Sequence, residues 1–248
     1  MTDASTDTGQ PLMDHLLELR NRLLKAMVAI FVVFLCLFYF SRELYTLVAK
    51  PLMDAMPAGT NMIATGVASP FLAPFKLTLY LSIFAAMPFI LHQAWAFVAP
   101  GLYKHEKKLA VPLLASSVLL FYAGAAFAYF VVFPLMFQFF TAIAPEGVAV
   151  TTDISSYLDF VLALFLAFGL AFELPIAIVL LVSTGATTVK KLSAARAYVV
   201  VGCFVLGMLL TPPDVISQTL LALPMWFLFE MGLLAARLVE KKPAADDQ

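Results

Sequence analysis

Glu173 carries the clearest chemical signal in the sequence, because this carboxylate stands inside the apolar segment AFGLAFELPIAIV. A charged side chain at the centre of a membrane costs about 2.5–3.5 kcal/mol on a lenient scale, and such residues usually serve a function. Pro175 follows two residues later and predicts a bend in the helix. We therefore expect Glu173 to form a polar spot on a concave helix face that touches a substrate, a partner or water. The alternative is a protonated carboxyl group paired with a neighbouring Tyr, Gln or Ser.

Glu18 and Glu106 are acids placed among basic residues near two ends of the long apolar runs. Glu18 lies in HLLELRNR, four residues before Arg22, and this spacing predicts a surface ion pair on a helix. Glu106 is the only acid in the basic segment YKHEKK, where local charge compensation is the ordinary role. Spacing alone favours these structural roles at both positions. The segment around Glu18 predicts an amphipathic helix over residues 11–22, resting on the membrane surface through the apolar stripe Leu12, Leu16, Leu19 and Leu23.

A third group of polar residues surrounds the tight connection TPPD at Thr211–Asp214. Two prolines stop one helix before the next, and Asp214 is placed to cap the following helix, where an anion is favoured. Gln218 follows one turn later, at membrane depth. Taken alone, these residues have structural roles, and Glu230 near the inner end of the last span can simply reach the membrane interface.

Several kinds of chemistry are absent from the sequence. It has no Walker A phosphate loop, no HExxH and no Cys/His cluster with metal-ligand spacing. We therefore expect no enzyme activity, no metal ion and no cofactor. The net charge of −1 offers no field that would attract nucleic acid. Function is then expected in binding and in the handling of something within the membrane.

The elements that position these residues must be membrane helices. Of 248 residues, 62% are hydrophobic and 12% are charged, whereas soluble domains are about 45–50% apolar and about 25% charged. Continuous apolar blocks, without the alternation of a membrane barrel, predict an all-α polytopic membrane protein. We expect one domain over residues 1–248 with a flexible tail at 239–248. It would have six transmembrane spans, near residues 23–41, 77–96, 112–134, 158–183, 196–210 and 215–233.

Basic residues predict how these spans are oriented. Six spans place both termini on one side, and that side would carry 12 Lys and Arg residues against 3 on the other. The positive-inside rule then predicts cytoplasmic termini, and a bacterial inner membrane is the simplest location. A short helix within residues 42–75 is expected to lie over the outer ends of the bundle. The short last two spans predict a locally thinned bilayer. A concave wall of kinked helices is favoured by Pro88, Pro134, Pro175 and Pro224.

Six sequence blocks together resemble the TatC family, the multispanning subunit of the twin-arginine protein translocase. They cover about residues 11–238, and the resemblance is to the bacterial form. The blocks are HLLELRNR at 15–22, PFKL at 74–77, FVAPGLYKHEKK at 97–108, FYAGAAFAYFVVFP at 121–134, AFELP at 171–175 and TPPDVISQTLLALPMWFLFEMG at 211–232.

This resemblance implies a receptor that binds signal peptides bearing an Arg-Arg pair at the cytoplasmic face. With single-span TatA and TatB partners and surrounding membrane lipid, it would export folded proteins using the proton-motive force, as an oligomer of TatB–TatC units. The resemblance assigns Glu18 and Glu106 to the signal-peptide site and Glu173 to the acidic residue of the bent fourth span. It assigns contacts with partner helices or the inserted signal peptide to Thr211, Asp214 and Gln218.

Two acids on separate elements suit the recognition of an Arg pair. Neighbouring side chains of an extended peptide point to opposite sides, and each guanidinium can bind a carboxylate bidentately. Two other interpretations stay open. A secondary transporter would also explain an intramembrane acid and broken helices, but the sequence shows no inverted repeat. A membrane scaffold would keep its peptide binding after Glu18→Ala and Glu106→Ala.

Overall fold

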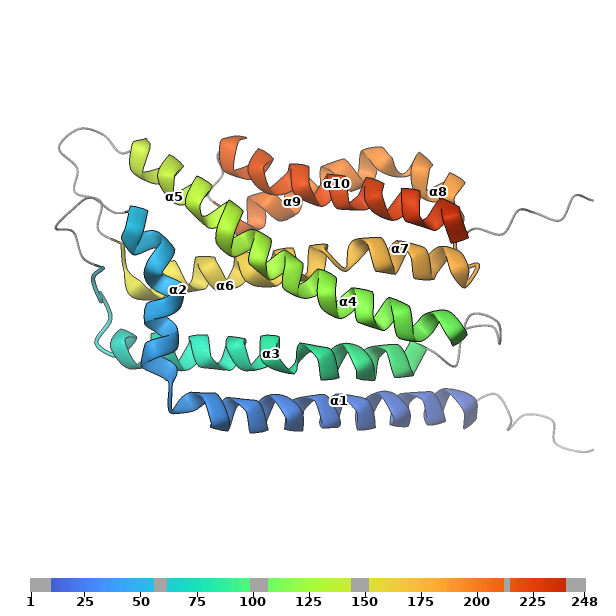
Figure 1. Cartoon of the computed structure of the whole chain (residues 1–248), viewed down its shortest axis with the longest axis horizontal. Coiled ribbons are helices and arrows are strands. Elements are labelled where there is room, and N and C mark those ends of the chain that lie inside the picture. The colour runs from blue at the N-terminus through green and yellow to red at the C-terminus, as the bar shows by residue number, and fades with distance from the viewer. Residues whose placement is uncertain (1–9, 56–61, 99–106, 144–151, 212–214, 240–248) are drawn as a thin grey trace, which may run out of the picture.

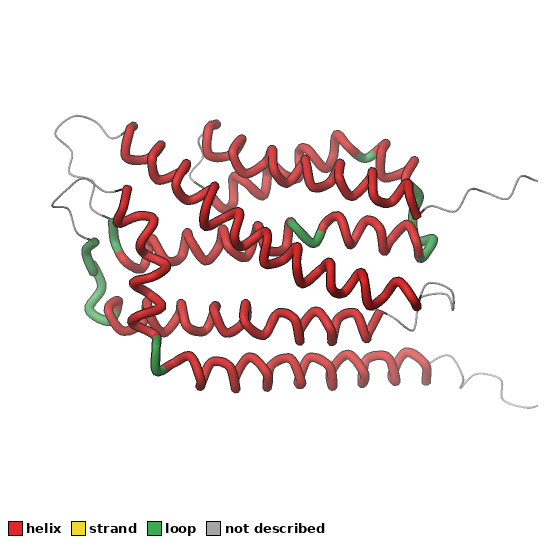
Figure 2. The backbone as a smooth tube through the Cα atoms, viewed as in Figure 1, coloured by secondary structure: helices red, strands yellow, loops and turns green. Residues whose placement is uncertain are grey.

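The computed structural model describes residues 10–55, 62–98, 107–143, 152–211 and 215–239. Helices make up nearly all of this part of the chain, where the β-structure is limited to an isolated bridge between Ile63 and Asp153 (Figures 1 and 2). The α-helices are α1 (Gln10–Phe38), α2 (Ser41–Ala55), α3 (Ser69–Val98), α4 (Lys107–Phe127), α5 (Phe133–Ala142), α6 (Ile154–Ala171), α7 (Leu174–Ser183), α8 (Val189–Ala194), α9 (Arg196–Leu210) and α10 (Val215–Val239). The expected all-α class is confirmed.

Within the described residues, five helical segments are long and apolar enough to cross a membrane. They are Leu16–Phe38, Ser69–Phe97, Val111–Ala142, Ile154–Ser183 and Val215–Val239. Helix α9 is apolar too, but its 15 residues reach only about 22 Å at 1.5 Å per residue, against about 30 Å of hydrocarbon. Helix α1 begins and α10 ends at the same end of the bundle (Figure 1).

Helix α1 differs from the expected arrangement of a surface helix over 11–22 followed by a separate span at 23–41. The structure has one continuous helix, Gln10–Phe38, which runs alongside α3 (Figure 1). The sequence between Leu12 and Phe38 contains no Gly or Pro to interrupt the helix. Aromatic rings join the two helices, since the Phe75 ring centroid lies 5.3 Å from Phe34 and 6.1 Å from Phe38.

The third pass does not end at Pro134, as the expected span 112–134 required. After α4, a π-helical segment at Ala128–Val132 leads directly into α5, which ends at Ala142. The backbone N–H of Phe133 donates to the Ala128 carbonyl, the spacing of a π turn. Pro134, which has no N–H to donate, follows directly after this π turn, in the first turn of α5.

The fourth pass is broken where the sequence predicted a bend. Helix α6 ends at Ala171 and α7 begins at Leu174, with Glu173 in the connection and Pro175 in the first turn of α7. The last pass corrects a second expectation, because α10 has 25 residues and is long enough for a normal bilayer. Only α9 remains short, so the span-length argument for thinning is restricted to that helix.

Helix α2 lies across one end of the bundle (Figure 1), as expected for the segment 42–75. Its Val48 and Ala49 are buried. Two tyrosine hydroxyls fasten it to the spans, because Tyr157 donates to the Val48 carbonyl over 2.9 Å and Tyr129 to the Leu47 carbonyl over 3.1 Å. The orientation of α2 is therefore set by backbone carbonyls that accept hydrogen bonds from α6 and the π segment.

Glycines allow two of the helix pairs to approach closely. A Cβ atom at Gly124 on α4 would lie 2.5 Å from the Phe168 carbonyl oxygen of α6. A Cβ atom at Gly232 on α10 would lie 2.9 Å from the Pro175 Cα of α7. Backbone cannot move aside as a flexible side chain can, so these two contacts fix the spacing of the helices around Glu173.

Candidate functional site

Glu173 lies at the break between α6 and α7, where it occupies the N-cap position of α7. Its Oε1 atom is buried and has no hydrogen-bond partner among the described residues. The side chain that interacts with its carboxyl group is Ser117 of α4, which is itself buried. A serine neighbour is one of the partners that the structural interpretation of Glu173 required.

Trp95 extends this polar contact to a third helix. The indole Nε1 of Trp95 on α3 donates to the Ser117 Oγ over 3.3 Å. Since the hydroxyl accepts from Trp95, its own hydrogen remains available to the Glu173 carboxyl. Three helices thus converge on one carboxyl group inside a membrane-spanning bundle. Such a network orients the acid and leaves one of its oxygens available to another group.

Glu18 lies in the first third of α1, and α1 begins at the end of the bundle at which α10 ends (Figure 1). Arg22 donates from both Nε and Nη2 to its Oε1, at 2.9 and 2.5 Å. This is the i,i+4 ion pair that the spacing predicted. The Glu18 side chain is 38% exposed, so the carboxylate stays accessible from outside while it holds a guanidinium. Glu106, its expected counterpart, lies outside the described residues.

Thr211 and Gln218 lie where α9 meets α10. Thr211 is buried and donates its hydroxyl to the Gly207 carbonyl over 2.9 Å, which ends α9. The backbone of Gln218 packs on Gly207, because a Cβ there would lie 3.4 Å from the Gln218 carbonyl oxygen. Asp214, between them in the sequence, lies outside the described residues. Thr211 therefore has a structural contact, and the half-exposed Gln218 side chain is available for others.

The expected site residues do not form one cluster. Gly232, which packs on Pro175 beside Glu173, is 14 residues after Gln218 in α10. That separation corresponds to about 21 Å along the helix axis. Glu173 and Gln218 consequently lie at different depths in the bundle. The expected site residues that the structure describes lie in three separate polar regions, at Glu18, at Glu173 and at the junction of α9 with α10.

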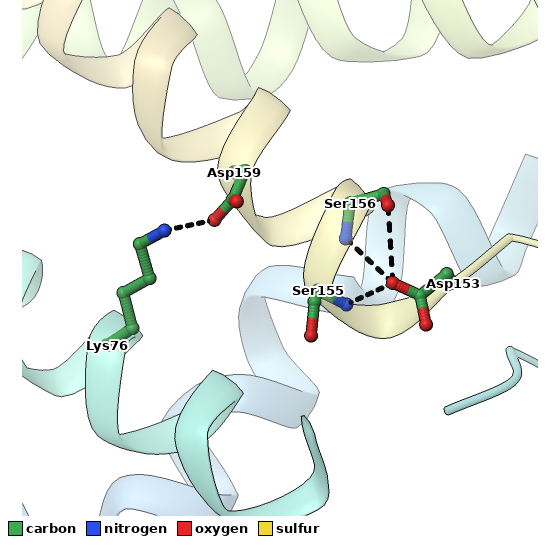
Figure 3. Close-up of polar contacts among 5 residues, drawn as sticks. All are labelled: Lys76, Asp153, Ser155, Ser156 and Asp159. Atoms are coloured by element: carbon green, nitrogen blue, oxygen red, sulfur yellow. Dashed lines mark hydrogen bonds and ion pairs between the residues drawn. The ribbon is translucent and has the colours of Figure 1, made fainter. Parts of the chain in front are cut away.

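Two ion pairs link spans and were not predicted from the sequence. Lys76 of α3 binds Asp159 of α6 (Figure 3). Arg196 at the start of α9 binds both oxygens of Glu230, with Nε–Oε1 at 2.7 Å and Nη2–Oε2 at 2.8 Å. Glu230 therefore has an internal partner, which agrees with a structural role. Each pair joins residues far apart in the sequence, and helical periodicity does not show such contacts.

Asp153 organises the end of the bundle that α2 crosses. One carboxylate oxygen accepts from the backbone N–H groups of Ser155 and Ser156 at the start of α6 (Figure 3), and the other accepts from Thr65. The Thr65 and Ser156 hydrogen bonds hold the pKa of Asp153 well below its usual range. Burial, followed by the negative charge of Asp153, raises the pKa of nearby Tyr45 to about 12.

A cavity of about 620 Å³ opens between α3, α6 and α9. Its walls are mostly aliphatic, and the Lys76–Asp159 pair and Tyr80 are its polar groups. Leu170, Ala171 and Leu174 also line it, so the cavity reaches the level of the break beside Glu173. Glu173 itself is not among the lining residues, so this cavity is not the concave face that was expected around that acid.

These features define a polytopic helical membrane protein built for binding. Among the residues that the structure describes, no group of three or more His, Cys, Asp and Glu side chains could hold a metal ion. A family model described as "Sec-independent protein translocase protein (TatC)" matches residues 14–224. The chain belongs to the TatC family, and it is a multi-pass membrane component of a bacterial protein translocase and not an enzyme.

Individual relatives agree with this assignment. The chain is 62% identical to a TatC protein of Azotobacter chroococcum over 98% of this chain and 96% of that protein. It is 60% identical to the TatC protein of Escherichia coli K12 over 94% and 90% of the two chains. A crystal structure described as the twin-arginine translocase receptor TatC matches with a TM-score of 0.82 and 36% identity, covering 91% of this chain and 99% of that one.

Proposed function

We propose that this chain is the receptor of a twin-arginine translocase, which binds Arg-Arg signal peptides at the cytoplasmic face of the inner membrane. With TatA- and TatB-type partners it would export folded proteins using the proton-motive force. Family membership supports the proposal, and so does the solved relative described as the translocase receptor. The start of α1 and the end of α10 at one end of the bundle agree with two cytoplasmic termini.

The observation that carries this proposal is the contact between Glu18 and Arg22. Glu18 already binds a guanidinium through two N–H groups, which is the chemistry that an incoming arginine requires. An i,i+4 pair on a helix surface is worth only about 0.3–0.5 kcal/mol. A peptide arginine can therefore replace Arg22 at little cost.

The second acid of the proposed site is Glu106. Helix α4 begins at Lys107, at the same end of the bundle as the start of α1 (Figure 1). Glu106 precedes that helix directly in the sequence. Two acids on separate segments would bind the two arginines from opposite sides of an extended peptide.

Other residues are proposed to act after the peptide has bound. Through its unpartnered oxygen, Glu173 would accept a hydrogen bond from the inserted signal peptide or from a partner helix. Asp214 and Gln218, with Thr211, would provide contacts for TatA- or TatB-type helices in an oligomer of TatB–TatC units. Helix α9 beside them has only 15 residues and is too short to cross the membrane. We therefore expect a longer partner helix to pack next to it.

The proposal is tested by peptide binding to the purified full chain with one acid neutralised at a time. Glu18→Gln and Glu106→Gln should each weaken binding of a fluorescent Arg-Arg signal peptide by about tenfold or more, since a charge-assisted hydrogen bond is lost. Glu43→Gln on the exposed face of α2 is the matched control and should leave the affinity unchanged. If all three variants bound the peptide as tightly as the unmodified chain, the assigned site would be rejected.

A further inference from the structure

The Lys76–Asp159 pair is unusual because it lies inside a mostly aliphatic cavity. The cavity of about 620 Å³ is lined by both residues. Its aliphatic walls include Leu162, Leu166 and Leu170 of α6 and Leu206 and Leu210 of α9. The pair therefore forms a polar head at one end of an apolar groove that opens between membrane helices.

The pair is placed near one surface of the membrane. Asp159 lies six residues after Asp153, or about 9 Å along α6 from its N-cap. The span Ile154–Ser183 has 30 residues and a length of about 45 Å, so about 7 Å at each end extends beyond a hydrocarbon core of about 30 Å. The pair thus lies at the boundary between lipid headgroups and acyl chains.

Neither charge is fully satisfied by the other. The Lys76 and Asp159 side chains are 45% and 57% exposed. The hydrogen bond described for them joins Lys76 Nζ to Asp159 Oδ1. An ammonium group has three donors and a carboxylate has about four acceptor sites. Both groups accordingly have capacity for an additional partner.

We propose that this groove binds one zwitterionic phospholipid whose headgroup carries a primary ammonium. Its phosphate accepts from Lys76, its ammonium donates to Asp159, and one acyl chain lies along Leu166, Leu170 and Leu206. The apolar lining extends from Asp159 to Leu174, about 22 Å along the helices. One hydrocarbon leaflet is about 15 Å deep, so the groove accommodates a chain that ends at the bilayer centre.

The charges of the pair select among headgroups. A purely anionic lipid would meet the Asp159 carboxylate, and the repulsion would offset its attraction to Lys76. A choline headgroup has no N–H and cannot donate to that carboxylate. A primary ammonium can do so, and this difference predicts preference for phosphatidylethanolamine. The inference goes beyond the proposed receptor function, because neither Lys76 nor Asp159 takes part in the recognition of the arginines.

The test is native mass spectrometry of the delipidated full-length protein in detergent. The protein is titrated separately with phosphatidylethanolamine, phosphatidylcholine and phosphatidylglycerol. We expect phosphatidylethanolamine to bind about tenfold more tightly than phosphatidylcholine, the effect of one charge-assisted hydrogen bond. Equal binding of the three lipids, or a preference for phosphatidylglycerol, would overturn the proposal.

Variants show whether the lipid occupies this groove. Asp159→Asn should remove the preference over phosphatidylcholine, and Lys76→Gln should weaken the binding of both lipids. Lys190→Gln on the exposed start of α8 is the matched control and should change nothing. Leu166→Trp, which fills the apolar part and leaves the charges in place, should also displace the lipid. A preference that survives Asp159→Asn would contradict the assignment.

A protein helix is the competing occupant of the groove. A photoreactive group at Leu206 should label phosphatidylethanolamine in membranes that contain the complete translocase. Labelling of a partner helix or a second copy of the chain, with no lipid adduct, would overturn the proposal. Thermal unfolding of each variant distinguishes loss of the lipid site from loss of the fold.

Discussion

The Trp95 indole on α3 donates a hydrogen bond of 3.3 Å to the Ser117 hydroxyl on α4, and that hydroxyl interacts with the Glu173 carboxyl between α6 and α7. The contact joins three membrane helices through side chains that lie 22 and 56 positions apart in the sequence. Buried polar networks are stabilising when their members are satisfied and costly when one is removed. Glu173 is therefore held in place by this contact, and its Oε1 atom is buried.

Removal of this network should destabilise the protein in a coupled manner. Trp95→Phe and Ser117→Ala should each reduce the free energy of unfolding by about 1–2 kcal/mol. The double variant should lose less than the sum of the two, because they break the same hydrogen bond. Unfolding in mixed micelles followed by circular dichroism measures these values, with Ser116→Ala as the control. Strict additivity would show that Trp95 and Ser117 do not interact.

Two glycines in different surroundings are predicted to respond differently to an added methyl group. Gly124→Ala should cost about 1–3 kcal/mol, since its methyl group would meet the Phe168 carbonyl oxygen and force the helices apart. Gly202 on α9 faces open space, because a Cβ atom there would meet no other atom within 4 Å. Gly202→Ala should therefore be neutral or stabilise by up to about 1 kcal/mol. Thermal unfolding of the two variants measures these effects. Equal losses of stability would contradict the close packing at Gly124.

Asp153 predicts a dependence of stability on acid pH. Hydrogen bonds lower its pKa in the folded protein below the ordinary value of 3.8. The folded state then binds fewer protons than the unfolded state. This contribution to stability is present above about pH 4 and is lost as the pH falls toward the folded pKa.

Comparison with Asp153→Asn isolates that effect, because an asparagine still caps α6 but does not titrate. The wild-type protein should lose its advantage over the variant between about pH 5 and pH 2 in unfolding experiments. Parallel curves for the two proteins over this range would contradict the role of the carboxylate.

Arg22 predicts a gain in peptide binding when it is removed. Arg22→Ala frees Glu18 from its internal partner, and a pair of this kind is worth about 0.3–0.5 kcal/mol. Affinity for an Arg-Arg peptide should therefore rise about twofold. Arg20→Ala removes the same charge from an exposed neighbour without freeing Glu18. Isothermal titration compares the two variants, and an equal effect of both would assign the gain to net charge.

Much of the fold follows from the sequence, and the contacts between helices do not. Continuous apolar blocks predict an all-α fold, and the interval between Ala195 and the TPPD turn places α9 at 196–210 as observed. Glu173 and Pro175 mark the break between α6 and α7. The π segment before Pro134 was not foreseen, because the proline alone indicates an end and the segment is set by packing against α6 and α2.

The polar contacts between different helices could not be predicted from the sequence, for a different reason. Helical periodicity predicts the Glu18–Arg22 pair, since both residues share one helix. The partners Lys76 and Asp159 are separated by 83 residues, and their meeting depends on how α3 packs on α6. Trp95 and Ser117 likewise meet only because α3 and α4 pack together.

The central claim is that the chain recognises a pair of arginines through two carboxylates. The most direct measurement is photocrosslinking of a signal peptide to the membrane-embedded protein, with a second peptide in which both arginines are lysines. Lysine keeps the charge but cannot form the bidentate contact. We expect strong labelling by the arginine peptide and little by the lysine peptide, whereas equal labelling by both would contradict the account.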